Sequence, residues 1–463
     1  MNTPSDIVPF PIVDGQYRME REPIVRIGVI LREDDKAEVR FAVPGAGYVL
    51  EGSEGALPAG EVLSVRVEAG TLTLANTAGA EVAKAGVLRI MPPAGAQGRK
   101  AGDGVLVKEM VAGRGFHWKK LIDQTLTGIL EFRADGGRVV LVNELPLEEY
   151  LVGVVTGEMS GACPPEFIKA QTIAARSWLL AQPVAPHAGE PFIWCNDDCC
   201  QRYQGTGGWS AEARDAVAAC RGEVLITPSN HYCDARYSKN TGGISEDAEN
   251  VWGTPMEGLV SMIDAPKGSA VERFFPVTES NIEEYLTGDW LKETDCFAGP
   301  NVCRDDELPQ YLGRVDEPGT YFRWRVPVTQ ETLRESLVQR AGITDLRDVL
   351  ALRPIRRGRS GRLNQMAVDY RAADGQRKTH LLNSEYNIRA AMRTSFLYSG
   401  AFIVADQRYA GEALASATLV GGGWGHGAGF CQIGGLGRAL KGQSYAEILL
   451  AYFSGVRIER IYD

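Results

Sequence analysis

Short apolar runs broken by turn residues dominate the first hundred residues, and they constrain the fold more than any other feature. The runs IVRIGVIL, VLSVRV, TLTLAN and VLRIM lie between residues 24 and 92, separated by Gly, Asp-Asp and Ala-Gly turns. Runs of this length and composition are typical of strands. The 53 glycines and 23 prolines of the chain also indicate many turns. We therefore predict an α+β fold dominated by strands.

The length and the charge of the chain limit its organisation and its partners. The 463 residues, 44% of them hydrophobic, suit two or three domains, or one domain with insertions. The net charge of -10 argues against nucleic acid or an anionic membrane surface as the main partner. No stretch approaches the length of a transmembrane helix. The N-terminus has no charged start followed by an apolar run, so we predict no signal peptide.

We predict four regions along the chain. Residues 1–104 form an N-terminal β-rich region that ends in the loop PPAGAQGRKAGDG, which is typical of a flexible boundary. Residues 105–271 form the first part of a core, residues 272–318 are an insertion, and residues 319–463 form the second part of the core.

Glu158 is the first candidate for chemistry. It follows the apolar run LPLEEYLVGVV, whose spacing is roughly helical, and precedes Pro164-Pro165, which opens a helix predicted over EFIKAQTIAARSWLLAQ. A carboxyl against an apolar wall is desolvated, which favours its protonated form. A general acid for glycosidic bond cleavage needs that form. The alternative is a helix-cap or surface glutamate.

Cysteines cluster in the middle of the chain. Five of the nine fall in one window, namely Cys195, Cys199, Cys200, Cys220 and Cys233. Such clustering indicates a metal site or disulfides. In PHAGEPFIWCNDDCCQRYQG, thiols and the imidazole of His187 have a spacing that can bind zinc. Because Cys199 and Cys200 are adjacent, we expect only one of them to be a ligand alongside Cys195; a disulfide or buried thiols remain alternatives.

Two further loops carry weaker signals of function. GGGWGHGAGF, residues 421–430, has almost no side chains except Trp424, His426 and Phe430. Its glycines allow close approach of the backbone, and a histidine beside an aromatic ring suits a sugar-binding cleft, although a lone histidine in such a loop is usually structural. YSKNTGGISE, residues 237–246, is typical of a polar turn.

Taken in order, these segments resemble the SpoIID/LytB family of bacterial cell-wall proteins. The resemblance rests on NELPLEEYLVGVVTGEM, PPEFIKAQTIAARSW, CQRYQG, ARYSKNTGG and WGHGAGFCQIGG, followed by SYAEILLAYFSGV. It extends roughly from Leu126 to Ile461, with the insertion outside it. It implies a SpoIID-like catalytic core with a central cleft between the Glu158 helix and the Gly-rich loop. The implied activity is that of a lytic transglycosylase on peptidoglycan glycan strands without stem peptides.

The resemblance also implies roles for individual residues. The catalytic glutamate of the family corresponds to Glu158, and the zinc ligands of some members correspond to His187, Cys195 and Cys200. The polar groups of the matching motifs are interpreted as lining the cleft or orienting Glu158, and they are Gln171, Arg176, Tyr203, Tyr237, Asn240, Thr241, His426 and Gln432. The family further implies a location in the cell envelope, while the lack of a predicted signal peptide leaves a cytoplasmic location as the alternative.

Three functional hypotheses follow. In the first, Glu158 protonates the glycosidic oxygen and then takes a proton from the muramic hydroxymethyl group, so one carboxylate serves both steps and leaves an anhydro-muramic end. In the second, the protein binds cell wall without catalysis and enhances an N-acetylmuramoyl-L-alanine amidase, as attributed to LytB-type relatives. The third is a hydrolase, which needs a second carboxylate about 6.5–9.5 Å away if inverting or about 5–5.5 Å if retaining. The candidates for that carboxylate are Glu148, Glu149 and Glu166.

Overall fold

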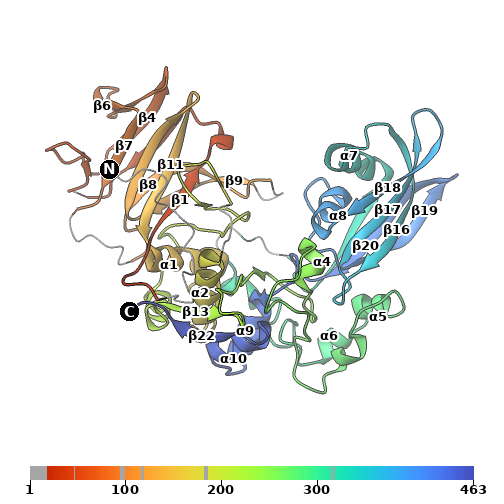
Figure 1. The fold of residues 1–463 in the computed structure, drawn as a ribbon. Helices are drawn as coiled ribbons and strands as arrows, with labels where there is room; N and C mark the ends of the chain where they lie inside the picture. The colour runs from red at the N-terminus through yellow and green to blue at the C-terminus, as the bar shows by residue number, and fades with distance from the viewer. Residues whose placement is uncertain are drawn as a thin grey trace. The chain divides into compact units, whose positions relative to one another are not determined.

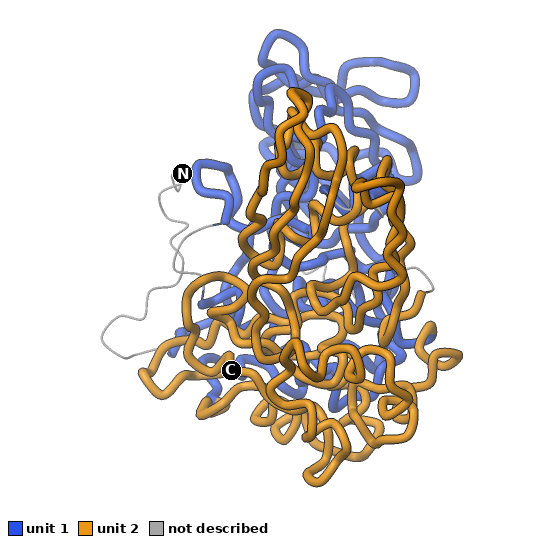
Figure 2. The backbone as a smooth tube through the Cα atoms, turned by 90° about the vertical axis from the view of Figure 1, so that its right-hand side faces the viewer, with its two compact units in different colours: residues 1–224, 310–316, 459–463 blue, residues 225–309, 317–458 orange. Residues whose placement is uncertain are grey.

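The computed structural model describes residues 18–45, 47–93, 100–115, 119–181, 186–313, 316 and 319–463. The chain divides into two compact units, shown in Figure 2. Unit 1 holds residues 1–224, 310–316 and 459–463, and unit 2 holds residues 225–309 and 317–458. Strand residues outnumber helical residues, at 34% against 24%, so the predicted β-dominated α+β class is confirmed. Within the described ranges, every helix is too short or too polar to cross a membrane.

Three predictions concern residues that lie partly outside the described ranges. The signal-peptide prediction rests on the N-terminus, of which residues 1–17 are outside. The loop predicted over residues 92–104 includes residues 94–99, and the predicted insertion includes residues 314, 315, 317 and 318.

Two six-stranded sheets form the N-terminal part of unit 1 (Figure 1). Their orders are β12-β1-β11-β10-β7-β3 and β6-β5-β4-β2-β8-β9. In β4 alternate residues are buried, as expected for a strand with one face on a core. The rings of Phe41 in β2 and Phe132 in β10 lie 5.3 Å apart, so the inner faces of the two sheets pack on each other. The strands are β1 Ile24–Ile30, β2 Glu38–Ala42, β3 Val49–Leu50, β4 Val62–Glu68, β5 Thr71–Ala75, β6 Glu81–Ala85, β7 Val87–Met91, β8 Val105–Ala112, β9 Lys120–Leu126, β10 Ile129–Asp135, β11 Arg138–Pro146 and β12 Trp194–Cys195.

The predicted boundary at residue 104 falls inside this pair of sheets. Strand β1 pairs with β11, β7 pairs with β10, and β2 pairs with β8. Strands from residues 1–104 therefore share both sheets with strands from residues 105–146.

Three helices complete unit 1, namely α1 (Leu147–Glu158), α2 (Pro165–Leu180) and α3 (Ala211–Ala219). Helix α1 begins directly after β11, and every residue of it except Glu149 is buried. A helix that is buried all round lies inside its domain instead of on its surface. Helix α2 begins with Pro165 at its first position, as the sequence predicts. The chain thus delivers Glu158, the last residue of α1, into the interior of unit 1.

Unit 2 contains two three-stranded sheets, β15-β20-β19 and β16-β17-β18, and a small parallel pair, β14-β21. Helices α7 and α8 pack with both three-stranded sheets around one core that includes Trp324, Leu333, Met366, Ile388 and Leu419. The strands are β14 Tyr237–Ser238, β15 Arg323–Thr329, β16 Leu346–Arg357, β17 Leu363–Ala372, β18 Arg377–Asn383, β19 Phe402–Ala410, β20 Ala413–Gly422 and β21 Phe430–Cys431. The helices are α4 Ala248–Trp252, α5 Ile282–Thr287, α6 Trp290–Glu293, α7 Gln330–Ala341, α8 Glu385–Met392, α9 Gln432–Leu440 and α10 Tyr445–Tyr452. Strands β13 (Glu223–Ile226) and β22 (Arg457–Arg460) each include a boundary between the units.

Candidate active site and metal cluster

Glu158 lies at the C-terminal end of α1 and is 8% exposed. Its Oε1 accepts a hydrogen bond of 3.0 Å from the backbone N–H of Arg202. The preceding residue must be small, because a Cβ on Gly157 would lie 2.8 Å from the Arg202 carbonyl oxygen. Glycine therefore lets the end of α1 approach the segment 195–204 closely enough for this hydrogen bond to form.

Residues 310–313 and 316, here called the return segment, also contact the end of α1 and the residues beside it. The N–H of Ser160 donates to the Tyr311 carbonyl at 2.8 Å, and Met159 forms a β-bridge with Leu312. A Cβ on Gly313 would lie 2.3 Å from the Gly157 carbonyl oxygen and 3.1 Å from that of Glu158. The return segment thus packs directly on the backbone that carries Glu158, although it is far from it in sequence.

The guanidinium of Arg202 joins the segment 195–204 to the return segment. It forms ion pairs with Asp198 at 3.1 Å and with Asp316 at 2.7 Å. The Arg202 side chain is only 10% exposed, and that of Asp316 9%. Burial of the positive charge is tolerated because two carboxylates neutralise it.

Four side chains in unit 1 form a candidate metal cluster, namely His187, Cys195, Cys199 and Cys200. Their ligand atoms all lie within 4.8 Å of one another. The sulfurs of Cys195 and Cys199 are 3.0 Å apart, and His187 Nε2 is 3.5 Å from the Cys200 sulfur. We expected only one of the two adjacent cysteines to join this cluster, but the turn at residues 197–200, closed by a hydrogen bond from the Cys200 N–H to the Asp197 carbonyl, brings both thiols to it.

The chemistry of these donors fits a cation. Hydrogen bonding with Cys195 lowers the pKa of the Cys199 thiol, and the hydrogen bond with Cys199 raises the pKa of Cys195. Hydrogen bonding with Cys195 also raises the pKa of Cys200. Three thiols and an imidazole form a common donor set for a tetrahedral metal site.

The segment 195–204 is fixed to the sheets beside the metal cluster. Arg114 donates to Asn196 Oδ1 at 2.9 Å and contacts Asp197 at 3.1 Å. The same guanidinium donates to Asp34 at 2.6 Å, and the backbone N–H of Arg114 donates to Asp197 at 2.8 Å. A segment held at its start by these contacts and by the cluster presents the Arg202 N–H to Glu158 from a fixed backbone.

Three of the predicted polar residues of unit 1, Gln171, Arg176 and Tyr203, have no exposed surface. The Arg176 guanidinium donates to both oxygens of Glu148, at 3.0 and 2.6 Å. The Tyr203 hydroxyl donates to Asn143 at 2.9 Å. These contacts occupy the side chains of Arg176 and Tyr203 within the fold.

The other five predicted residues belong to unit 2: Tyr237 lies in β14, Asn240 and Thr241 lie in the loop after it, His426 lies in the Gly-rich loop, and Gln432 is the first residue of α9. Strand β14 pairs with β21, and the backbones of Asn240 and Trp424 exchange hydrogen bonds of 2.9 and 2.7 Å. The buried guanidinium of Arg362 donates to the carbonyls of Asn240 and Thr241 at 3.3 and 3.2 Å. At Gly427, with φ of +76°, a Cβ would lie 2.2 Å from the Arg362 guanidinium carbon, so this position requires glycine.

His426 has both ring nitrogens in use. Its Nδ1 accepts from the Ala428 N–H at 3.1 Å, so the proton lies on Nε2, which is 2.9 Å from the Tyr237 carbonyl oxygen. Burial lowers the pKa of His426 to about 3. A neutral imidazole with both nitrogens bonded to the backbone is not a proton donor to a substrate.

Partly exposed aromatic rings surround this histidine and its loop. Trp252 lies 4.9 Å from the His426 ring, and Arg236 lies 4.3 Å from the centre of the Trp252 ring. Trp424 stacks on Tyr398 at 4.2 Å. The five residues of unit 2 are therefore brought together beside aromatic surfaces. Glu158 belongs to unit 1, so the cleft predicted between it and the Gly-rich loop stays a prediction.

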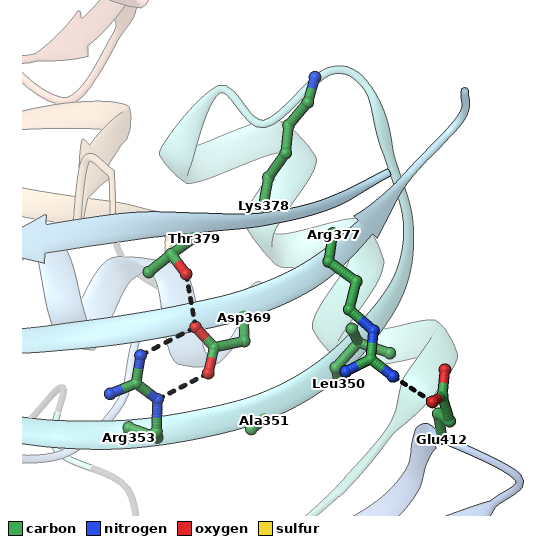
Figure 3. A pocket seen from close by; sticks show the side chains of 8 residues that line it. All are labelled: Leu350, Ala351, Arg353, Asp369, Arg377, Lys378, Thr379 and Glu412. Carbon is green, nitrogen blue, oxygen red and sulfur yellow. Dashed lines mark hydrogen bonds and ion pairs between the residues drawn. The ribbon is translucent and has the colours of Figure 1, made fainter. Parts of the chain in front are cut away.

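A hollow of about 520 Å³ lies on the exposed face of the sheet β16-β17-β18 in unit 2 (Figure 3). Asp369 is bound there by Arg353 at 2.6 and 2.9 Å and by Thr379 at 2.7 Å. Arg377 is paired with Glu412, and Lys378 points away from the hollow. Because the charged groups within it pair with one another, this hollow lacks the available polar groups of a ligand site.

Sequence reasoning missed Arg202, Asp316 and Arg362. Arg202 occupies the variable position of CQRY, and Asp316 lies in the region predicted to be an insertion. Arg362 lies in a strand-forming stretch that carries no motif. Only the position of Arg202 inside a matching motif could have indicated a role.

Comparisons with known proteins match the stretch of unit 1 that holds Glu158 and the candidate metal cluster. Residues 135–226 match the family described as "Stage II sporulation protein" (SpoIID). This match covers α1, Glu158, the metal cluster and Arg202. The SpoIID-like character predicted from the motifs is thus confirmed over this stretch. Residues 281–429 match a "Domain of unknown function (DUF8618)", which extends from the predicted insertion into the second part of the predicted core.

Individual relatives support the same reading. The chain is 32% identical over 152 residues to "Stage II sporulation protein D" of Bacillus subtilis (strain 168), which is 29% of this chain and 44% of that protein. It is 31% identical over 135 residues to the protein of the same name from Bacillus amyloliquefaciens, 26% of this chain and 39% of that protein. It is 23% identical over 313 residues to "Amidase enhancer" of B. subtilis, 66% of this chain and 40% of that protein. The chain thus spans less than half the length of each of these relatives.

Proposed function

We propose that the protein is a lytic transglycosylase of the bacterial cell envelope. It would cleave the bond between N-acetylmuramic acid and N-acetylglucosamine in peptidoglycan strands without stem peptides. The observation that carries this proposal is the position of Glu158: a buried carboxylate at a helix end, held through one oxygen by a backbone N–H. The SpoIID match over residues 135–226 supports it.

In this proposal Glu158 works twice. Its protonated carboxyl first gives a proton to the glycosidic oxygen, and the bond to the muramic anomeric carbon breaks. Its carboxylate then takes the proton of the muramic hydroxymethyl group, whose oxygen closes on the anomeric carbon. One group acts as acid and then as base, and the product carries an anhydro-muramic end. The neutral, fully bonded His426 supports Glu158 as the proton donor.

The positions of the alternative carboxylates argue against a hydrolase. Glu148 and Glu149 precede Glu158 by ten and nine residues on α1, which separates them from it by about 14–15 Å along the helix axis. Glu148 is also bound by Arg176 and by the Tyr462 hydroxyl. Glu166 is paired with Lys169 at 2.7 Å. None of these arrangements favours a second catalytic carboxylate at the distances that hydrolysis needs.

We further propose that the cluster of His187 and three cysteines binds one structural zinc ion. A site with four protein ligands leaves no open position for water or substrate, as is usual for structural zinc. Such a site would hold the start of the segment 195–204 and thereby the Arg202 N–H that contacts Glu158. The aromatic and polar groups of the unit 2 loops, including Trp424 and Tyr398, are proposed to hold the glycan.

The test is product analysis on amidase-treated peptidoglycan. We expect the wild-type protein to release glycans with anhydro-muramic ends, detected by mass spectrometry. Glu158→Gln keeps an oxygen that can accept the Arg202 N–H but cannot transfer the proton, so we expect a loss of about 10²–10⁴-fold. Glu166→Gln is the control and should keep full activity. Reducing ends in place of anhydro ends would contradict the proposal.

A second candidate function is enhancement of an N-acetylmuramoyl-L-alanine amidase. It is favoured by the alignment with the protein named "Amidase enhancer", which covers 66% of this chain. The Glu158→Gln variant separates the two functions. If it still accelerates an amidase on whole peptidoglycan and the wild type makes no anhydro ends, the enhancer function holds and the transglycosylase fails.

A further inference from the structure

We propose that Asp316 is a positioning residue for Glu158 that acts through Arg202. This inference rests on the proposed function, because it assigns Asp316 to the same reaction. Asp316 comes from the return segment, which lies outside the residues 135–226 that match the SpoIID family.

The contacts form one connected path from Asp316 to the proposed acid. The Asp316 carboxylate pairs with the Arg202 guanidinium at 2.7 Å, and the Arg202 backbone N–H donates to Glu158 Oε1 at 3.0 Å. The guanidinium of Arg202 thus binds the return segment, while its backbone N–H binds the end of α1. Fixing its guanidinium also limits the freedom of its backbone N–H, which sets the direction of the Glu158 carboxyl.

Asp316 is held by two hydrogen bonds to Gly313. The Gly313 N–H donates to one Asp316 carboxylate oxygen at 3.1 Å, and the Asp316 N–H donates to the Gly313 carbonyl at 3.0 Å. Gly313 packs on the carbonyls of Gly157 and Glu158. Asp316 is therefore tied to the backbone of the catalytic glutamate on one side and to Arg202 on the other.

Asp316 also helps to neutralise the buried positive charge of Arg202. Arg202 is buried beside Glu158, and a buried guanidinium needs carboxylate partners. Asp198, four residues before Arg202, supplies one of them at 3.1 Å. Asp316 is the other partner, at 2.7 Å, and the Arg202 backbone N–H donates to the Glu158 carboxyl. Loss of Asp316 would free the guanidinium to turn toward Glu158 and pair with it.

The experiment compares Asp316→Asn and Asp316→Glu with Asp306→Asn. Asp306 is a matched control, since it lies ten residues before Asp316 in the chain and also pairs with an arginine, but its ion pair with Arg304 is exposed. The assays are steady-state kinetics on amidase-treated glycan strands, and hydrogen exchange of the peptide covering residues 199–204 without substrate. For Asp316→Asn we expect kcat to fall about 10–100-fold, the cost of a small misplacement of a catalytic group, with KM unchanged. We also expect faster exchange of the peptide.

Asp316→Glu should recover part of kcat, and Asp306→Asn should match the wild type. A rise in KM with unchanged kcat would overturn the proposal, because it would make Asp316 a glycan contact. An unchanged kcat, or equal losses in the Asn and Glu variants with a lowered melting temperature, would also overturn it. If the wild type forms no anhydro ends, the proposed function fails, while the exchange measurement still decides whether Asp316 holds the segment at Glu158.

Discussion

Glu148 and Glu158 stand at opposite ends of one buried helix and have different partners. Glu148 is surrounded by donors: Arg176 binds both oxygens, and Tyr462 and Gly222 donate to one of them. Glu158 accepts a backbone N–H. A carboxylate that satisfies a buried guanidinium serves the fold, and this role of Glu148 is consistent with the proposal that Glu158 is the acid of the reaction.

The pair of Glu148 and Arg176 gives a stability prediction. Glu148→Gln removes the negative charge and leaves the Arg176 guanidinium, which is 0% exposed, without its counter-ion. We expect unit 1 to lose about 3–5 kcal/mol of stability, as when one partner of a buried pair is removed. Urea titration followed by hydrogen exchange of α1 and α2 measures this loss. Glu212→Gln on the exposed side of α3 is the control, and equal effects of the two variants would contradict the prediction.

His426 gives a prediction for pH. Burial lowers its pKa in the folded protein to about 3, against 6.5 in the unfolded chain. The unfolded state therefore binds more protons between these values, and stability is lost as the pH falls from 6.5 toward 3. We expect His426→Gln to have a shallower pH dependence of unit 2 unfolding than the wild type. Glu246, whose pKa is raised to about 6 by burial, contributes an opposite slope in both proteins and cancels in the comparison. Parallel curves would show that His426 does not titrate as expected.

At the scale of elements, the segment 195–204 connects the metal cluster to Glu158. We expect about one zinc per chain by elemental analysis, and we expect Cys199→Ser to lower zinc occupancy as strongly as Cys195→Ser does. Loss of zinc should also reduce formation of anhydro ends, since the Arg202 N–H is then less well placed. Cys220→Ser is the control, because Cys220 is buried elsewhere in unit 1. Full zinc occupancy in Cys199→Ser would contradict this prediction and would show that only three protein side chains bind the ion.

The contact between α1 and the same segment gives a packing prediction. A Cβ on Gly153 would lie 2.4 Å from the Tyr203 ring, whose centre is 5.1 Å from that of the tilted Tyr150 ring. We expect Gly153→Ala to destabilise unit 1 by about 1–3 kcal/mol, the usual cost of overpacking a core. Gly136→Ala is the comparison, because Gly136 has open space around it and a positive φ of 55°. A smaller loss of stability in Gly136→Ala than in Gly153→Ala would show that the overpacking at Gly153 costs more than backbone strain at a turn.

The sequence predicted individual helices and strands better than the tertiary contacts between them. Periodicity and turn residues indicated the strands between residues 24 and 92 and the helices that became α1 and α2, because those signals are local. The prolines at the start of α2 were informative for the same reason. The bond between Arg202 and Asp316 joins residues 114 apart, and the burial of Arg362 depends on strands that pair only in the folded chain. Such contacts are set by tertiary packing, which no local pattern encodes.

At the scale of the whole molecule, unit 1 is built from three separate stretches of chain. The third stretch, residues 459–463, includes Tyr462, whose hydroxyl donates to Glu148, and Ile461, whose carbonyl accepts from the Met19 N–H. We expect a chain ending at residue 458 to melt at a clearly lower temperature, with faster hydrogen exchange in α1 and α2. Trimming of chain ends is usually harmless, so an unchanged melting temperature would show that these contacts add little.

The same three-part construction governs when unit 1 can complete its fold during synthesis. Unit 1 begins near the first residues of the chain, and its last residues are those at the C-terminus. Translation adds about 5–20 residues per second, and N-terminal domains usually fold first. Here the N-terminal unit waits for residues 310–316 to support Glu158 and for residues 459–463 to cover Glu148. Residues 310–316 and 459–463 must therefore be synthesised before the contacts that they provide to Glu158 and Glu148 can form, so unit 1 cannot complete its fold while only its first stretch has left the ribosome.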